Sequence, residues 1–271
     1  MRVLIVGDVH GDFAGLAECL EWAVAEHAVS AAFQVGDFGF FRERMEAWLA
    51  RRQRFVVPVH VIDGNREDHG WLARCCRKGE VTRWRESFNL CYQPRPSLAS
   101  VNGICVGFLG GALHVHRRQE HRVFIGRPNY IDTTQLARAV ELFTREPPRL
   151  LVTHSCPAGI GIGLRGDPAL KLSVINHVVD AGFDPGPIDD RGETILSQLW
   201  QQLAARPQAW VFGHFHRRHE AVIEDTHFVC AGAFEWPACT GQEFFCWDSE
   251  SGGVDRIRFP GTAADGELCS G

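Results

Sequence analysis

The sequence predicts an α/β fold of four layers, in which two mixed β-sheets pack face to face and helices cover their outer faces. Short apolar runs rich in branched residues, typical of buried strands, alternate with helix-like segments over most of the chain. Three more strand-like runs then follow in succession, at 227–231, 243–247 and 254–259. This order of elements favours two mixed sheets over one parallel sheet.

The early strands are expected at five runs: 2–6, 31–35, 56–62, 149–153 and 209–212. Each is short, mostly apolar and rich in valine, leucine or phenylalanine, as a strand buried on both faces should be. A further strand is expected at 103–109.

Four helices are expected between these strands, at 13–27, 43–54, 133–145 and 193–205. Asp12 is placed to cap the first of them, which carries apolar residues at helical spacing. Asp132 and Gln135 form a capping-box pattern at the start of the third, and the Pro147-Pro148 pair stops it.

A short polar block follows each of the five early strands directly. The blocks are Asp8-Val9-His10, Gly36-Asp37, Gly64-Asn65, Thr153-His154 and Gly213-His214-Phe215-His216. Loops at the carboxyl ends of strands in an open α/β sheet gather along one crevice, so residues far apart in the sequence can meet there. Glycines in four of these loops permit tight turns and close approach of the backbone to a ligand. We therefore expect the five blocks to form one site.

In this order the blocks resemble the motifs of the calcineurin-like metallophosphoesterase superfamily, which read Asp-x-His, Gly-Asp, Gly-Asn-His, a lone His and Gly-His-x-His. The resemblance spans Asp8 to His216, and the ordered set is specific although any single block is weak. It implies the αββα sandwich and a phosphohydrolase in which a hydroxide bridging two metal ions attacks phosphorus.

The resemblance also implies a role for each polar side chain. One metal would be held by Asp8, His10 and His216, the second by Asn65, His154 and His214, and Asp37 would bridge the two. Catalytic roles fall to Arg66, Asn65 and His154, with His154, His214 and Arg66 holding transition-state oxygens.

The ligand chemistry narrows the choice of metal. Two divalent ions about 3.5–4 Å apart can share a hydroxide and neutralise charge in an in-line displacement. Mixed imidazole and oxygen ligation without thiolate suits Mn²⁺, Fe or Zn²⁺ and disfavours Mg²⁺ or Ca²⁺. We expect Mn²⁺, with Fe, Zn²⁺ or Ni²⁺ as alternatives.

The chain departs from the resembled pattern at Arg66, which stands where the family has the histidine thought to protonate the leaving group. Arginine stays charged, with a pKa above ~12, so it cannot act as a general acid near neutral pH, although it can grip a phosphate oxygen. Three alternatives follow: the leaving group departs unprotonated, another group such as His69, His114 or His116 donates, or the enzyme is weak.

A glycine-rich run after the 103–109 strand, Gly110-Gly111-Ala112-Leu113-His114, is a second candidate for substrate contact. A basic, histidine-bearing loop beside two metals could bind the rest of a phosphorylated substrate. The alternative is a solvated charged loop. We favour His114 as the substrate-binding residue because it comes first after the glycines.

Composition is that of a soluble enzyme in a reducing compartment. A formal net charge of −5 gives no global attraction to nucleic acid, and no apolar run approaches the ~20 residues of a membrane span. Ten cysteines without a Cys-x-x-Cys pair, and no signal-peptide pattern, indicate the cytoplasm. We expect one metallophosphoesterase domain over 1–260 and a disordered tail over 261–271. The sequence does not indicate an oligomeric state.

The function predicted is a binuclear-metal phosphohydrolase that cleaves a phosphodiester or phosphomonoester in a small phosphorylated substrate or nucleotide. A nucleotide phosphoanhydride hydrolase, or a non-catalytic scaffold of the same fold, are the alternatives. The serine/threonine-phosphatase branch reads Gly-Asp-x-Val-Asp-Arg-Gly at the second block, whereas this chain has Gly36-Asp37-Phe38-Gly39-Phe40-Phe41. This difference argues against a protein phosphatase of that branch.

Overall fold

The computed structural model describes residues 1–114, 128–162, 168–180, 182, 190–236 and 242–259. Their strands form two six-stranded sheets, one in the order β12-β11-β1-β2-β3-β4 and the other in the order β5-β6-β7-β8-β10-β9. In the first sheet β1 to β4 pair in parallel, and β11 and β12 add antiparallel pairs at one edge. In the second sheet the central pairs are parallel and both edge pairs are antiparallel, so both sheets are mixed.

The strands of the first sheet are β1 Arg2–Val6, β2 Val29–Gln34, β3 Val59–Val61, β4 Leu90–Tyr92, β11 Glu243–Asp248 and β12 Val254–Arg258. Those of the second sheet are β5 Ser97–Val101, β6 Ile104–Leu109, β7 Leu150–Thr153, β8 Ala209–Phe212, β9 His219–Ile223 and β10 Thr226–Cys230.

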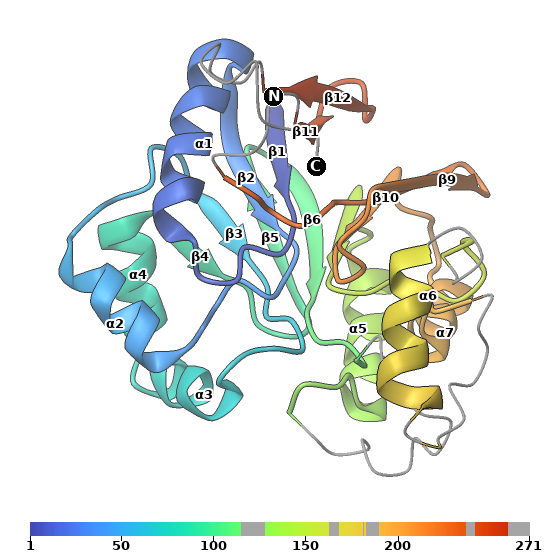
Figure 1. The fold of residues 1–271 in the computed structure, drawn as a ribbon. Coiled ribbons are helices and arrows are strands. Elements are labelled where there is room, and N and C mark those ends of the chain that lie inside the picture. The colour runs from blue at the N-terminus through green and yellow to red at the C-terminus, as the bar shows by residue number, and fades with distance from the viewer. Residues whose placement is uncertain (115–127, 163–167, 181, 183–189, 237–241, 260–271) are drawn as a thin grey trace, which may run out of the picture.

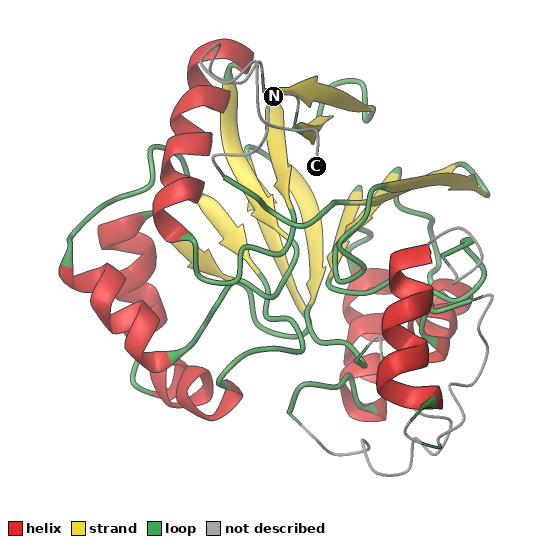
Figure 2. Cartoon of the chain, viewed as in Figure 1, coloured by secondary structure: helices red, strands yellow, loops and turns green. Residues whose placement is uncertain are grey.

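The helices fall into two groups on opposite sides of the paired sheets (Figure 1, Figure 2). The first group is α1 Phe13–His27, α2 Arg42–Ala50, α3 His69–Arg77 and α4 Glu80–Phe88. The second is α5 Thr133–Arg145, α6 Pro168–Val174 with the π-helical turn Ile175–Val179, and α7 Thr194–Gln202.

Three apolar clusters separate the four layers: one lies between the first helix group and the first sheet, one between the two sheets, and one between the second sheet and the second helix group. Alternate side chains of the strands enter different clusters, as the period of two in a strand requires. In β1, Val3 and Ile5 join the cluster between the sheets, whereas Leu4 and Val6 face the first helix group. The expected αββα sandwich is thereby confirmed.

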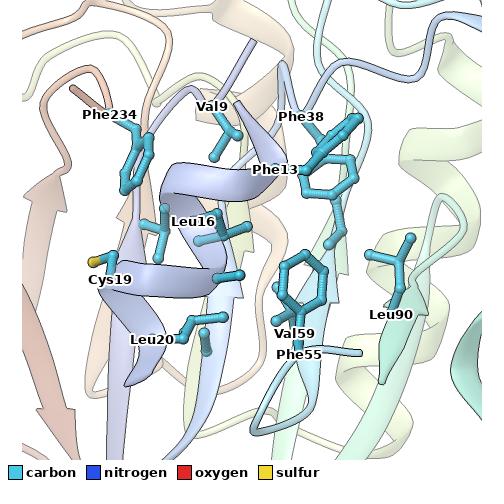
Figure 3. Packing of buried hydrophobic residues seen from close by; sticks show 14 of the residues in the cluster. Val9, Phe13, Leu16, Cys19, Leu20, Phe38, Phe55, Val59, Leu90 and Phe234 are labelled. Atoms are coloured by element: carbon cyan, nitrogen blue, oxygen red, sulfur yellow. The ribbon is translucent and has the colours of Figure 1, made fainter. Parts of the chain in front are cut away.

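Helix α1 shows how one element is fixed to its sheet. Asp12 caps it by accepting the Gly15 N–H at 3.0 Å, as its position before an apolar-periodic segment predicted. Its buried face presents Leu16 and Leu20 to the first sheet, among aromatic rings from the neighbouring loops (Figure 3). The helix thus holds the loop that carries Asp8 and His10.

Several expected boundaries were wrong by a few residues. The strand expected at 56–62 is limited to β3, because Val56 is exposed and Pro58 has no N–H to donate. The helix expected at 43–54 ends at Ala50, where the chain turns through Arg52 at a left-handed φ of 54°. The helix expected at 193–205 ends at Gln202, and Leu203 is already extended.

The described cysteines are free thiols. In the described part of the chain, no helix has the length and apolar character needed to cross a membrane.

Candidate metal centre

The five polar blocks come together where the parallel strands end. Asp8 and His10 follow β1, Asp37 follows β2 and Asn65 follows β3, all from the first sheet. The second sheet contributes the three others, His154 after β7 and His214 and His216 after β8. Hydrogen bonds join the two sets: the His214 N–H donates to Asp8 Oδ1 at 2.9 Å, and His154 Nδ1 lies 2.7 Å from the Val35 carbonyl oxygen.

Asp8, His10 and His216 form a first group whose donor atoms could hold one cation. His216 Nε2 lies 3.1 Å from Asp8 Oδ2 and 3.2 Å from His10 Nε2. Asp8 is fully buried, and its Oδ2 atom faces His216 Nε2. A buried carboxylate oxygen facing two imidazole nitrogens suits a divalent cation.

Asp37, Asn65 and His154 form a second cluster beside it. His154 Nε2 lies 3.1 Å from Asn65 Oδ1 and 3.5 Å from Asp37 Oδ1. The His214 ring is close by, with its centroid 4.8 Å from that of His154. Asp8, Asp37 and His154 also satisfy the spacing of a cation site, so Asp8 belongs to both candidate groups. The bridging role of Asp37 stays a prediction.

The hydrogen-bond pattern of His154 fixes the nitrogen that it presents to the site. The Val35 carbonyl oxygen can only accept, so Nδ1 carries a proton and Nε2 faces the two oxygens. Burial by itself lowers the pKa of His154, but the Asp37 carboxylate raises it to about 9. A divalent cation in place of the Nε2 proton would meet the same oxygen and nitrogen atoms.

Opposing effects also act on the other titratable ligands. Burial disfavours the charged form of Asp37, yet His154 and the Arg66 N–H hold the pKa of this carboxyl below its usual value. Burial lowers the pKa of His10, whereas the hydrogen bond to Asp8 raises that of His216. Asp37 is therefore ionised and His10 is neutral near pH 7, the states in which both can bind a metal.

Four of the seven candidate ligands have backbones in the left-handed region. The φ angles are 51° at His10, 50° at Asp37, 70° at His214 and 53° at His216. Residues with side chains rarely adopt this conformation, and such strain clusters at functional sites. The loops are held in it by contacts such as that from the His10 N–H to the Asp37 carbonyl at 2.8 Å.

Glycine is required sterically in three of the blocks. A Cβ at Gly36 would lie 2.5 Å from His154 Nδ1, one at Gly64 would lie 2.2 Å from Asp37 Oδ1, and one at Gly213 would lie 2.4 Å from Asp8 Oδ1. These contacts explain why these three blocks begin with glycine.

Two supporting side chains were not anticipated from the sequence. Gln34 is the buried last residue of β2, and its amide donates to the Gly7 and Gly36 carbonyls and accepts the Gly36 N–H. Glu67 accepts the Gly39 and Phe40 N–H groups, at 3.2 and 2.6 Å. The position of Gln34, a polar residue at the end of an apolar strand, was the signal in the sequence that could have indicated its role.

Arg66 and His114 both lie beside the centre. The Arg66 N–H donates to Asp37 Oδ1 at 2.8 Å, and its side chain is exposed. Its charge adds to the effect of burial that lowers the pKa of His10, and it opposes the hydrogen bond to Asp8 that raises the pKa of His216. His114 Nδ1 lies 3.0 Å from Asn65 Nδ2.

The other proposed proton donors differ in position. His69 is 10% exposed and its Nδ1 lies 3.4 Å from the buried Asp63 carboxylate, so it packs behind the Asn65 loop. His116 and the tail from 261 lie outside the described residues.

The sequence matches the calcineurin-like phosphoesterase family over residues 1–218. The chain belongs to this family. It is therefore a metallophosphoesterase, a hydrolase that acts on phosphoesters. No curated protein matches the chain.

Several solved structures are similar to this chain at low sequence identity. The protein TT1561 of Thermus thermophilus is 10% identical, with a TM-score of 0.57 over 95% of this chain and 98% of that one. An archaeal phosphodiesterase is 11% identical, with a TM-score of 0.44 over 96% and 100% of the two chains. A putative 5′-nucleotidase of Staphylococcus aureus is 13% identical, with a TM-score of 0.48 over 95% and 52%.

Proposed function

We propose that this metallophosphoesterase uses two divalent metal ions, with Mn²⁺ preferred, to hydrolyse a phosphodiester or phosphomonoester in a small phosphorylated substrate or nucleotide. The observation that carries the proposal is the convergence of carboxylate, amide and imidazole groups from five loops into two adjoining clusters. Fe, Zn²⁺ and Ni²⁺ suit the same mixed nitrogen and oxygen ligands.

We assign the ligands to two metal positions. Asp8, His10 and His216 would hold one ion, and Asn65, His154 and His214 the other, with Asp37 shared. When bound, the ions would supply Lewis-acid activation of water and charge to balance the phosphoryl oxygens. The Val35 carbonyl keeps the His154 ring in one orientation and one tautomer, which is the role expected of an outer-shell partner.

Arg66 and His114 are placed to bind the substrate. The exposed Arg66 guanidinium provides a fixed positive charge beside His10 and His216, suited to a non-bridging phosphoryl oxygen. His114 would contact the substrate from the side of Asn65.

The second ligand block supports a small substrate over a phosphoprotein. Phe38 and Phe40, which follow Asp37, are fully buried in the core on the side of the first helix group. They therefore offer no charged group to a protein-bound phosphate. A nucleotide phosphoanhydride remains the alternative substrate class. We also propose that the protein acts in the cytoplasm, on the basis of its cysteine content.

A screen of metals against substrates tests the function. The purified protein would be loaded with Mn²⁺, Ni²⁺, Zn²⁺ or Mg²⁺ and assayed against chromogenic monoesters and diesters and against nucleotides. We expect Mn²⁺ to give the highest activity on an ester. Tight binding of near-stoichiometric metal without hydrolysis of any ester or anhydride would support the scaffold alternative.

Asp37→Asn tests the assigned bridge. We expect the variant to stay folded and to lose hydrolysis, because a neutral amide would hold the two ions less well. Asp255→Asn, which changes an exposed carboxylate on β12, is the matched control and should keep wild-type turnover. Wild-type turnover and full metal content in Asp37→Asn would rule out the bridge.

A further inference from the structure

A buried ion pair lies directly behind the Asn65 loop. Asp63 precedes Gly64, and Arg95 lies between β4 and β5; their side chains are 2% and 6% exposed. Arg95 Nε donates to Asp63 Oδ2 at 2.9 Å, and Nη2 donates to the same oxygen. The Tyr92 hydroxyl donates to Oδ1 at 3.2 Å. Both oxygens of Asp63 are therefore engaged, which restrains the chain just before Asn65.

The same guanidinium also holds the chain on the other side of the His114 loop. Arg95 Nη1 donates to the Tyr130 carbonyl at 3.2 Å, and Nη2 donates to the Pro128 carbonyl at 2.7 Å. The guanidinium also packs against the backbone of Gly111. A Cβ added at Gly111 would lie only 2.4 Å from Arg95 Nη1, and the φ of +86° at this position favours glycine as well. One buried arginine thus contacts three segments that are far apart in the sequence.

Asp63 contacts the glycine turn from the opposite side. The Gly111 N–H donates to the Asp63 carbonyl at 2.8 Å, and the Ala112 N–H donates to the Asn129 carbonyl at 3.0 Å. A Cβ at Gly110 would lie 2.5 Å from Asp63 Oδ1, so this turn has room only for glycine. The turn is consequently fixed to the ion pair on both faces.

His114 follows this turn and meets the metal-ligand loop. Its Nδ1 lies 3.0 Å from Asn65 Nδ2, and the preceding Leu113 N–H donates to the buried Glu193 carboxylate at 2.9 Å. An amide nitrogen can only donate, so His114 Nδ1 accepts and Nε2 carries the proton. The contact also orients Asn65, whose Oδ1 faces His154.

We propose that Arg95 is a positioning residue for hydrolysis, acting by fixing His114 against Asn65 through its pairing with Asp63 and its contacts to the glycine turn and to 128–130. The inference rests on the proposed phosphoester hydrolysis and on His114 as a substrate contact. Arg95 lies outside all five ligand blocks and touches none of the candidate ligands among its described contacts.

Arg95→Lys is the principal variant. Lysine keeps the positive charge, but its ammonium group donates from one nitrogen, whereas the planar guanidinium donates from three. We expect kcat/KM for a chromogenic ester to fall roughly 10- to 100-fold, since small misplacements at a reacting centre have effects of this size. Metal content should stay at the wild-type value. The paired variant Asp63→Asn/Arg95→Met removes both charges together, and so avoids an unpaired buried charge if the single variant folds poorly.

Arg149→Lys is the matched control. Arg149 also clamps chain segments, donating to Gln208 Oε1 and to the Ser249 carbonyl, but it precedes β7, whereas His154 follows that strand. Its replacement should change kcat/KM less than twofold.

A double-mutant cycle separates positioning from general stability. If Arg95 acts through His114, then Arg95→Lys should change kcat/KM little in a protein that already carries His114→Ala. An undiminished effect of Arg95→Lys in the His114→Ala background would overturn the proposal.

Histidine NMR gives a readout that does not depend on activity. In Zn²⁺-loaded, ¹⁵N-histidine-labelled protein, with His114 assigned from the His114→Ala spectrum, Arg95→Lys should shift or broaden the His114 ring signals and Arg149→Lys should not. Unchanged His114 signals in Arg95→Lys would contradict the positioning role. A wild-type protein that hydrolyses no ester would contradict the proposed function, while the NMR comparison would still decide whether Arg95 fixes His114.

Discussion

Arg66 places a permanent positive charge where the motif that the sequence resembles has a histidine. Its backbone N–H donates to Asp37, and its exposed side chain lies close enough for its charge to act on the rings of His10 and His216. The residue can therefore assist binding and charge stabilisation but cannot deliver a proton to a departing alkoxide.

Rates should for this reason depend steeply on the acidity of the leaving group. General-acid assistance contributes about 10²–10⁴-fold, roughly 3–5 kcal/mol, so its loss should be plain in a series of esters. Arg66→His should accelerate alkyl esters more than p-nitrophenyl esters and flatten the dependence, while weakening substrate binding. Steady-state kinetics across the series measure both effects.

Arg52→His, at an exposed position after α2, is the control and should leave the dependence unchanged. Similar rates for alkyl and nitrophenyl esters in the wild type, with chemistry shown to be rate-limiting, would mean that another group donates the proton. His114 and His69 would then be replaced in turn.

His60 gives the fold a sensitivity to acid that is separate from the candidate metal centre. Its ring packs between Phe33 and Phe108, and its Nδ1 lies 3.0 Å from Gln93 Nε2. Burial, with a smaller contribution from the charge of Arg85, lowers the pKa of His60 to about 4. The imidazole is thus neutral in the folded protein at any pH above that value.

Folding stability should fall as the pH drops from about 6.5 to about 4. The unfolded chain binds a proton at His60 below its usual pKa of about 6.5, whereas the folded chain does so only near 4. The unfolded state is therefore favoured progressively through this window, by about 3 kcal/mol at its lower end. Urea unfolding at a series of pH values, with chelator present, should show a shallower loss in His60→Phe. Parallel stability curves for the two proteins would contradict this effect.

At the scale of elements, the strands that carry the ligands were predictable and several others were not. Strands β1, β7 and β8 are short apolar runs buried on both faces, so their composition alone indicates them. Strands β5 and β9 lie at sheet edges, are partly exposed and carry polar residues, which leaves no such pattern.

The missed helices have a similar cause. Helices α3 and α4 each span nine residues and follow one another across Gly79; α3 buries Trp71, Leu72 and Cys75, and α4 buries Trp84. Short helices depend on tertiary packing more than on local preference, and the partners in that packing are not visible in a local window of sequence. Helix α1, with its regular apolar face and Asp12 cap, was predicted with the bounds that the structure shows.

Leu20 tests how far α1 depends on its packing against the first sheet. The side chain is fully buried among the residues drawn in Figure 3. Leu20→Ala should lower the free energy of unfolding by about 2–5 kcal/mol, because it leaves a cavity in a close-packed core. Urea unfolding measures the loss. Catalytic rates well below the melting temperature should stay near wild type, since the variant replaces none of the candidate ligands.

Glu21→Ala, on the exposed face of the same helix, is the matched control. It should change the unfolding free energy by no more than about 0.5 kcal/mol. Equal losses for the two variants would show that helix formation, and not burial against the sheet, limits stability.

At the scale of the whole molecule, the candidate metal centre joins the two sheets. The convergence of the blocks was predictable because parallel strands present their carboxyl ends on one side. The supporting contacts were not predictable, because Arg95 and Asp63 belong to segments that are apart in the sequence and become neighbours only in the folded structure. Residues at ligand positions have a chemical signature in the sequence, whereas residues that hold them in place resemble any other buried polar group.

Metal should therefore stabilise the whole fold. Asp8 and Asp37 come from the first sheet, and His154 and His216 from the second, so a bound ion links both sheets in the folded state and finds no such site in the unfolded chain. Metal at a concentration 100 times the dissociation constant of one site adds about 2.7 kcal/mol to the free energy of unfolding, which corresponds to several degrees in melting temperature for a chain of this size.

Calorimetry should show the melting temperature rising with added Mn²⁺ and falling again with chelator. The rise should be smaller with Mg²⁺, which prefers oxygen ligands alone. Asp8→Asn should lose most of the Mn²⁺-induced rise, because Asp8 belongs to both candidate groups. The exposed Asp255→Asn should keep it. An equal Mn²⁺-induced rise in Asp8→Asn and wild type would place the metal elsewhere in the molecule.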